Sequence, residues 1–238
     1  MNVLAIDTAS YVMGVGLLKN GKPVGELVTH EKKNHSLRLM PAIRSLFEQV
    51  DLTPKELDRI VVNHGPGSYT GVRIGVTTAK TMAYSLGIPV VGVSSLKVLS
   101  LNGVHFSGEV VPFFDARRGQ VFTGLYNENQ QVLDDRIIML DEWLQLLATR
   151  DTSRFLFISP DLHMHQEVIE SALGERAVFA QSPYELMRPS ALALSGMRLE
   201  SDSSVHLFKP NYLRLAEAES KWREQNPGKV ESYEPKRN

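Results

Sequence analysis

The chain repeats one order of predicted elements, and this repeat restricts its fold more than any single motif does. In the first half, apolar periodicity predicts strands at 3–8, 11–19, 22–29, 59–63 and 88–93, with helices at 36–50 and 71–86. Asn20-Gly21 predicts a hairpin between the second and third strands, because both residues tolerate positive φ. Gly87 predicts the end of the second helix.

The second half follows nearly the same order. It predicts strands at 109–116, 119–127, 131–140, 154–159 and 177–180, with helices at 141–149, near 164–173 and at 190–200. Asp141 is the expected N-cap of the first of these helices. Three antiparallel strands followed by alternating parallel units describe a five-stranded mixed sheet with helices packed on it.

Two such units predict an α/β fold of two lobes, the duplicated βββαβα arrangement of the actin, sugar-kinase and Hsp70 (ASKHA) class. In that class a nucleotide lies between the halves. We expect an N-terminal lobe over 1–104, a C-terminal lobe over 105–216 and a polar tail over 217–238, whose composition predicts partial disorder.

Charge and composition restrict the setting in which the chain works. The 26 basic and 27 acidic residues nearly balance, so bulk charge does not attract the whole molecule to nucleic acid or to a membrane. The absence of cysteine excludes disulfides and thiolate sites. No basic n-region opens the chain, and no apolar run approaches the roughly 18 residues of a membrane span. A cytoplasmic protein is the expectation.

The stretch HGPGSYTGVRIG, residues 64–75, raises the question of phosphate binding. Gly65, Gly67 and Gly71 fit neither the dinucleotide fingerprint nor the P-loop, which also needs a Lys-Ser/Thr pair. The glycines, Ser68 and a helix N-terminus near Thr70 could still present backbone N–H groups to a phosphate. The alternative is a tight strand-to-helix turn, and both interpretations stay open.

Asp7, Thr8 and Ser10 are further candidates for phosphate or nucleotide contact, because the ASKHA class places an acid and a small hydroxylic residue in its first hairpin. Alternatively, Asp7 closes the turn by accepting hydrogen bonds from backbone amides. An ATPase of this fold needs a second carboxylate, and Asp115 occupies the equivalent place in the second half. The two arginines that follow it favour a structural Asp–Arg arrangement over a general base.

The histidines do not have the spacing of metal ligands. The position one helical turn after His35 is Leu39, and His163 and His165 would point to different sides of a helix. Ser68 does not lie in a nucleophile-elbow motif. The sequence therefore predicts neither a metal site nor a catalytic residue.

Six stretches of the chain form a specific combination: VLAIDTA near the start, NHSLRLMP (34–41), GPGSYTGVRIG (65–75), PVVGVSSL (89–96), FFDARRGQVF (113–122) and PNYLR (210–214). Together they resemble the TsaB (YeaZ) family of bacterial tRNA-modification proteins. The catalytic relatives of the TsaD (Kae1) type carry a His-x-x-x-His metal pair on the first helix, whereas this chain has His35 and Leu39. The resemblance therefore implies a non-catalytic paralogue without peptidase activity.

The resemblance also implies partners. TsaB-like proteins pair with TsaD, and together with the ATPase TsaE they support transfer of a threonylcarbamoyl group to N6 of adenosine 37 in tRNAs that read ANN codons. It implies no tightly bound cofactor on this chain, ATP or ADP and metal on the partner subunits, tRNA contact through the complex and a homodimer when TsaD is absent. The alternative is a Mg-nucleotide-dependent phosphotransferase or ATPase of the same fold.

The resemblance places the partner interface on the two amino-terminal helices. The helix at 36–50 is apolar over more than one stripe, so it has more apolar surface than one contact needs. The expected interface residues are Leu39, Ile43, Leu46, Phe47, Val72, Val76, Ala79 and Ala83. The alternative is that the sheet and the neighbouring helix cover all of this surface.

Overall fold

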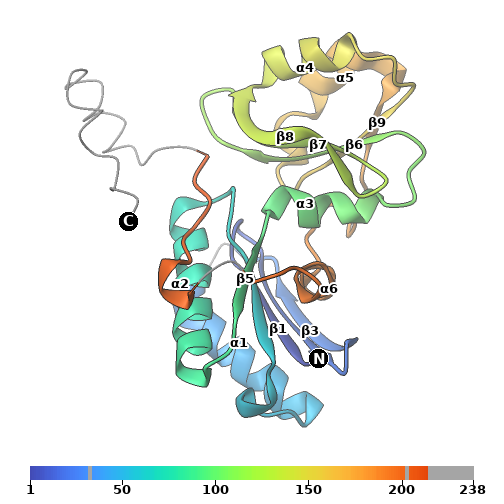
Figure 1. The fold of residues 1–238 in the computed structure, drawn as a ribbon. Helices are drawn as coiled ribbons and strands as arrows, with labels where there is room; N and C mark the ends of the chain where they lie inside the picture. The colour runs from blue at the N-terminus through green and yellow to red at the C-terminus, as the bar shows by residue number, and fades with distance from the viewer. Residues whose placement is uncertain (32–33, 202–203, 214–238) are drawn as a thin grey trace, which may run out of the picture.

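The computed structural model describes residues 1–31, 34–201 and 204–213, which form two lobes, each built on a five-stranded mixed sheet (Figure 1). The predicted tail at 217–238 lies outside the described residues. No helix among the described residues combines the length and apolar character that crossing a bilayer requires.

The first sheet has the strand order β3-β2-β1-β4-β5, and β1 is its central strand. Its strands are β1 (Val3–Asp7), β2 (Met13–Lys19), β3 (Lys22–Thr29), β4 (Arg59–Asn63) and β5 (Val90–Val93). β1 pairs antiparallel with β2 and parallel with β4, and all five of its residues are buried. Asn20 and Gly21 both have positive φ at the β2–β3 turn, which confirms the predicted hairpin.

The second sheet has the order β10-β9-β6-β7-β8, which repeats the first sheet strand for strand. Its strands are β6 (Glu109–Asp115), β7 (Gln120–Asn127), β8 (Gln130–Met139), β9 (Phe155–Ile158) and β10 (Ala177–Phe179). As in the first sheet, the first strand pairs antiparallel with the second and parallel with the fourth. The predicted duplication of the βββαβα order is confirmed.

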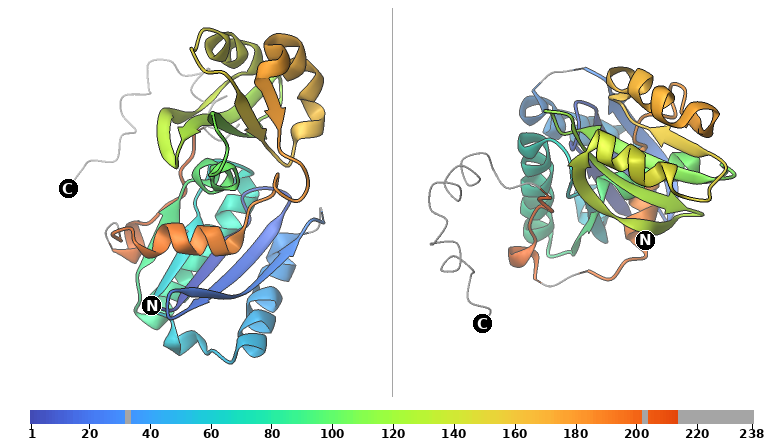
Figure 2. Two further views of the ribbon diagram at one scale, coloured as in Figure 1. Left: turned by 90° about the vertical axis from the view of Figure 1, so that its right-hand side faces the viewer. Right: turned by 90° about the horizontal axis from the view of Figure 1, so that it is seen from above.

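Helices cover the first sheet on both faces. α1 (His35–Val50) and α2 (Tyr69–Leu86) pack on one face, and α6 (Pro189–Met197) packs on the other (Figure 2). α4 (Leu140–Ala148) and α5 (Gln166–Leu173) cover the second sheet, while α3 (Ser95–Ser100) packs against β6 and β7 where the lobes meet. α2 ends at Gly87 in a left-handed conformation, as predicted.

The predicted extent of the C-terminal lobe, 105–216, is wrong at its end. α6 lies on β1, β2, β3 and β4 of the first sheet, so the chain returns to the N-terminal lobe after β10. The physical reason lies in Gly14 and Gly16 of β2, since an added Cβ would come within 2.6 Å and 2.9 Å of the Pro189 ring. These glycines allow α6 to approach the strand closely.

Two local predictions also differ from the structure. α3 was not predicted, because its six residues are too few to show a helical period. Asp141 is not the N-cap of α4 but lies in its first turn, because the helix begins at Leu140, whose backbone N–H donates to the carbonyl oxygen of Gly119 at 2.8 Å.

Candidate functional site

Asp7 is buried at the carboxyl end of β1, where the chain turns toward β2. The residue is 1% exposed, and its Oδ1 accepts a hydrogen bond from the Ala9 N–H at 3.0 Å. Burial raises the pKa of Asp7 from 3.8 to about 6, although hydrogen bonds from Asn63 and Ala9 and the charge of His35 oppose this shift. The carboxylate therefore closes the turn, as one of the two interpretations expected.

The glycine-rich stretch packs against this same turn. A Cβ on Gly67 would lie 2.2 Å from the Ala9 carbonyl oxygen, and a Cβ on Gly71 would lie 2.1 Å from that of Thr8. Hydrogen bonds join the two segments, since Ser68 N donates to the Ala9 oxygen at 2.7 Å and Thr8 Oγ1 donates to the Gly71 oxygen at 2.7 Å. The glycines are needed because two backbone segments touch here.

The other predicted contacts are also engaged within the chain. Ser10 Oγ accepts from the Val12 N–H at 3.1 Å, and the Ser10 carbonyl accepts from His35 Nε2 at 2.9 Å. Ser68 caps α2, with its Oγ accepting from the Gly71 N–H at 3.3 Å. A Cβ on Gly65 would lie 2.6 Å from the Asn211 carbonyl oxygen. The structure thus brings the predicted residues together, but as one packed turn.

The segment that leads into α6 closes this region from the opposite side. Asn63 at the end of β4 donates through Nδ2 to the Met187 sulfur at 2.9 Å, and both residues are buried. Sequence reasoning missed both residues, because they lie more than a hundred positions apart. The paired glycines of β2 were the available signal, since glycine inside a buried strand often marks a close approach of another segment.

A nucleotide phosphate and its magnesium ion do not fit these residues. Metal ligation needs an accessible carboxylate, whereas Asp7 is 1% exposed and already accepts hydrogen bonds within the turn. A phosphate cradle needs backbone N–H groups that face an open space, whereas the N–H groups of Ala9, Ser68 and Gly71 donate hydrogen bonds within the chain. The geometry favours the interpretation of HGPGSYTGVRIG as a tight turn.

Asp115 occupies the position in the second lobe that Asp7 occupies in the first. Its Oδ1 accepts from His165 Nε2 at 3.0 Å, and its Oδ2 accepts from the Arg117 backbone N–H at 3.2 Å. The carboxylate of Asp115 is therefore held by the His165 ring and by the Arg117 backbone N–H, which supports the structural interpretation over a free general base. Arg117 and Arg118 both have positive φ, so they form the β6–β7 turn that brings the Arg117 amide to the carboxylate.

The histidines take structural positions in this part of the molecule. His165 packs edge-on against the Phe113 ring, with a centroid distance of 5.8 Å, and His35 bonds the first turn through the Ser10 carbonyl. Within the described ranges, no three His, Cys, Asp or Glu side chains gather as a metal site requires.

The predicted interface residues lie in the core of the N-terminal lobe, so their assignment to a partner surface needs correction. All eight are at most 5% exposed: Leu39, Ile43, Leu46, Phe47, Val72, Val76, Ala79 and Ala83. They belong to the cluster that fills the space between the first sheet and helices α1 and α2. The apolar surface of α1 that these residues form is therefore covered within the chain.

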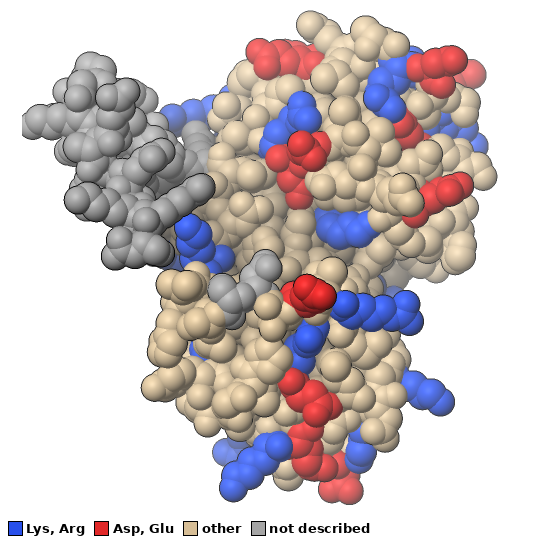
Figure 3. All heavy atoms as spheres, viewed as in Figure 1, with Lys and Arg blue, Asp and Glu red and all other residues tan. Residues whose placement is uncertain are grey.

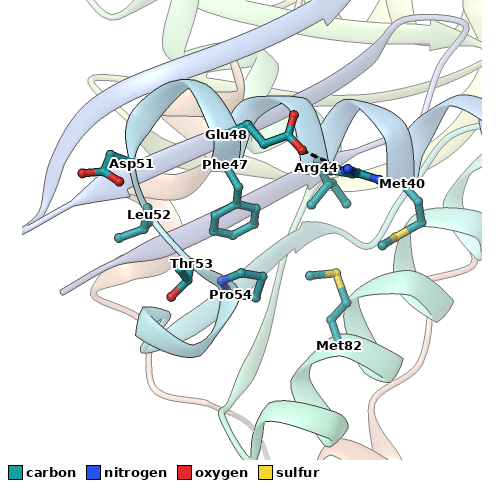
Figure 4. Close-up of a pocket in the computed structure, with 10 residues that line it drawn as sticks. Met40, Arg44, Phe47, Glu48, Asp51, Leu52, Thr53, Pro54 and Met82 are labelled. Carbon is teal, nitrogen blue, oxygen red and sulfur yellow. Dashed lines mark hydrogen bonds and ion pairs between the residues drawn. The ribbon is translucent and has the colours of Figure 1, made fainter.

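An apolar groove of about 390 Å³ lies beside the outer face of α1, between this helix, the segment 51–54 and α2 (Figure 4). Phe47 and Met82 point toward one another across it from α1 and α2, and Met40 lies at one end. Arg44 and Glu48 form an ion pair at 2.8 Å along its rim. Met40 is 49% exposed and Leu37, one turn before Pro41, is 73% exposed. This face combines exposed apolar side chains with a charged rim, a composition typical of protein interfaces.

Comparison with known proteins identifies the family. The family model described as "TsaD: tRNA N6-adenosine threonylcarbamoyltransferase" matches residues 25–222. The Bacillus subtilis "tRNA threonylcarbamoyladenosine biosynthesis protein TsaB" is 49% identical over 226 residues, which cover 93% of this chain and 98% of that protein. The chain belongs to the TsaB family. The resemblance of its motifs to the TsaB (YeaZ) family is confirmed.

Solved structures agree with the fold of a TsaB-family protein. YeaZ from Pseudomonas aeruginosa superposes with a TM-score of 0.73 at 24% identity, over 89% of this chain and 99% of that one. The inorganic polyphosphate/ATP-glucomannokinase from Arthrobacter sp. strain KM superposes with a TM-score of 0.51 at 10% identity, over 82% and 98%. The predicted ASKHA fold class is confirmed.

Proposed function

We propose that this chain is a non-catalytic subunit of the complex that forms threonylcarbamoyladenosine in tRNA. It binds a TsaD-type subunit and supports transfer of the threonylcarbamoyl group to N6 of adenosine 37. The observation that carries the proposal is the 49% identity with the Bacillus subtilis TsaB over nearly the full length of both proteins.

The surroundings of Asp7 and Asp115 support a non-catalytic role. These are the two carboxylates that an ATPase of this fold would use. Asp7 is enclosed by its turn, and Asp115 is paired with His165. Leu39 takes the place of a second metal-binding histidine and lies in the core at 1% exposed. We therefore assign ATP or ADP and metal to the partner subunits, which include a TsaE-type ATPase. tRNA binding and modification then belong to the assembled complex in the cytoplasm.

The outer face of α1 is the proposed contact for the TsaD-type subunit. Leu37 and Met40 are exposed there, and the groove beside them reaches Met82 of α2. Burial of these side chains would remove apolar surface from water, which favours association. In the absence of the TsaD-type subunit, a second copy of this chain would use the same face.

Reconstitution tests the function directly. A tRNA transcript, threonylcarbamoyl adenylate and purified TsaD-type and TsaE-type subunits should yield multiple turnovers of modified tRNA only when this chain is added. Modification measured by mass spectrometry of the nucleosides should fall at least tenfold without it. Equal modification in its absence would refute the proposal, and so would Mg-ATP turnover by the isolated chain that disappears in Asp7→Asn.

Met40→Glu tests the interface. A carboxylate placed in an apolar interface must lose its water, so we expect at least a tenfold loss of affinity for the TsaD-type subunit by calorimetry. Met164→Glu is the matched control, because Met164 is 55% exposed but lies on the C-terminal lobe. If both variants bound the partner like the native chain, the outer face of α1 would not be the interface.

A further inference from the structure

On the side of the N-terminal lobe that α2 forms, acidic residues are absent from the segments that the structure describes. Residues 59–108 contain no Asp or Glu, although 27 of the 238 residues in the chain are acidic. The segment 204–213, which packs along α2 at Val205–Leu207, also contains none. Figure 3 shows acidic side chains over the C-terminal lobe and the middle of the N-terminal lobe, whereas the flank over α2 carries none. Among the described residues, the flank over α2 therefore carries basic side chains such as Arg73 without acidic ones, in a protein of almost neutral net charge.

Exposed aromatic rings lie at the N-terminal end of α2 on this flank. Tyr69 opens α2 and stacks with Tyr212, with ring centroids 5.0 Å apart and an interplanar angle of 27°. The guanidinium carbon of Arg73 lies 4.7 Å from the centroid of the Tyr69 ring. Both tyrosines are 41% exposed. The cluster thus presents planar rings and a cation to solvent.

A similar arrangement occurs at the other end of α2. Tyr84 is 65% exposed and packs edge-on against His206, with ring centroids 5.0 Å apart. Between the two ends, Lys80 Nζ donates to the carbonyl oxygens of His206 and Phe208. At 1.5 Å per residue, the aromatic rings are spread over about 22 Å of helix.

These side chains form one stripe of α2 that is separate from the groove. Residues 69, 73, 80 and 84 are spaced by four, seven and four positions, which places them on one side of a helix. Met82 lines the groove shared with α1. It is two positions from both Lys80 and Tyr84, which places it about 160° around the helix axis from each of them. A partner seated in the groove would therefore leave the stripe beside it accessible.

We propose that this stripe, composed of Tyr69, Arg73, Lys80 and Tyr84 of α2 with His206 and Tyr212 beside them, contacts the RNA substrate of the complex. The cations attract the phosphate backbone, and exposed tyrosines provide surfaces on which unpaired bases stack. A tyrosine next to an arginine suits RNA, because the ring can stack on a base while the guanidinium binds a phosphate. The proposal rests on the proposed function, since the RNA is the tRNA that the complex modifies.

Binding of a tRNA transcript to the assembled complex with the TsaD-type subunit tests the proposal. Fluorescence anisotropy at several salt concentrations should show at least fivefold weaker binding for the double variant Tyr69→Ala/Tyr212→Ala. Tyr69→Phe/Tyr212→Phe keeps the rings and should bind like the native chain. Arg73→Gln should weaken binding severalfold and reduce the slope of log affinity against log salt by about one.

Matched controls separate the possible outcomes. Arg154 also lies over an aromatic ring, 5.8 Å from the centroid of Phe106, but it lies in the C-terminal lobe next to β6. Arg154→Gln should therefore leave RNA binding unchanged. If the stripe variants bound RNA like the native chain, the proposal would be overturned. It would also be overturned if these variants lost binding of the TsaD-type subunit, because the stripe would then be a protein interface. Failure of the native chain to bind that subunit would instead contradict the proposed function.

Discussion

Leu39→Glu is expected to unfold the N-terminal lobe before it affects any partner. Leu39 is 1% exposed and packs in the core between α1 and the first sheet. Truncation of a buried leucine alone costs about 2–5 kcal/mol, and a buried unpaired carboxylate adds its own desolvation cost. Because a native domain is stable by only about 5–15 kcal/mol, we expect an insoluble chain or a Tm at least about 10 °C lower.

Leu37→Glu is the matched control for this prediction. Leu37 lies on the same helix but is 73% exposed. The free energy of unfolding of the isolated variant should therefore stay within about 0.5 kcal/mol of the native value. Thermal denaturation followed by circular dichroism distinguishes the two variants. A Leu39→Glu chain that melted normally but lost its partner would return Leu39 to the interface.

Asp7→Asn is expected to change how stability depends on pH. Because burial raises the pKa of Asp7 from 3.8 to about 6, the folded chain binds the proton more tightly than the unfolded chain does. The protonated carboxyl thus stabilises the fold at low pH, and this contribution is lost as pH rises through about 6. The shift corresponds to about 3 kcal/mol in the acid limit, and a little less than half of it appears between pH 7 and pH 5.

Urea unfolding at pH 5, 6, 7 and 8 measures this effect. The native chain should gain stability relative to Asp7→Asn as the pH falls from 7 to 5, and the variant should be the more stable chain at pH 8. Taking the difference between the two chains cancels the titration of the other carboxylates. Asp151→Asn removes an exposed carboxylate and serves as the control. A constant difference between Asp7→Asn and the native chain across this range would contradict the burial of an ionisable Asp7.

The family could be predicted from the sequence, whereas the packing of the helices could not. The segments at 34–41, 65–75 and 113–122 carry specific side chains, and these were sufficient to indicate the TsaB family. The same sequence placed Leu39 and Leu46 on an interface, because a wide apolar helix face looks alike whether a sheet or a partner covers it. Only the position of α1 on β2 and β3 shows that both residues are in the core.

The order of strands and helices could be predicted from the sequence, because the periods of apolar residues and the turn residues act over short distances along the chain. The duplicated fold class could be predicted as well, since three strands followed by alternating helices and strands have few ways to pair. The packing of α6, the partners of Asp7 and Asp115 and the exposed faces of α1 and α2 could be read only from the folded chain. These features depend on contacts between residues such as Asn63 and Met187, whose proximity no local pattern encodes.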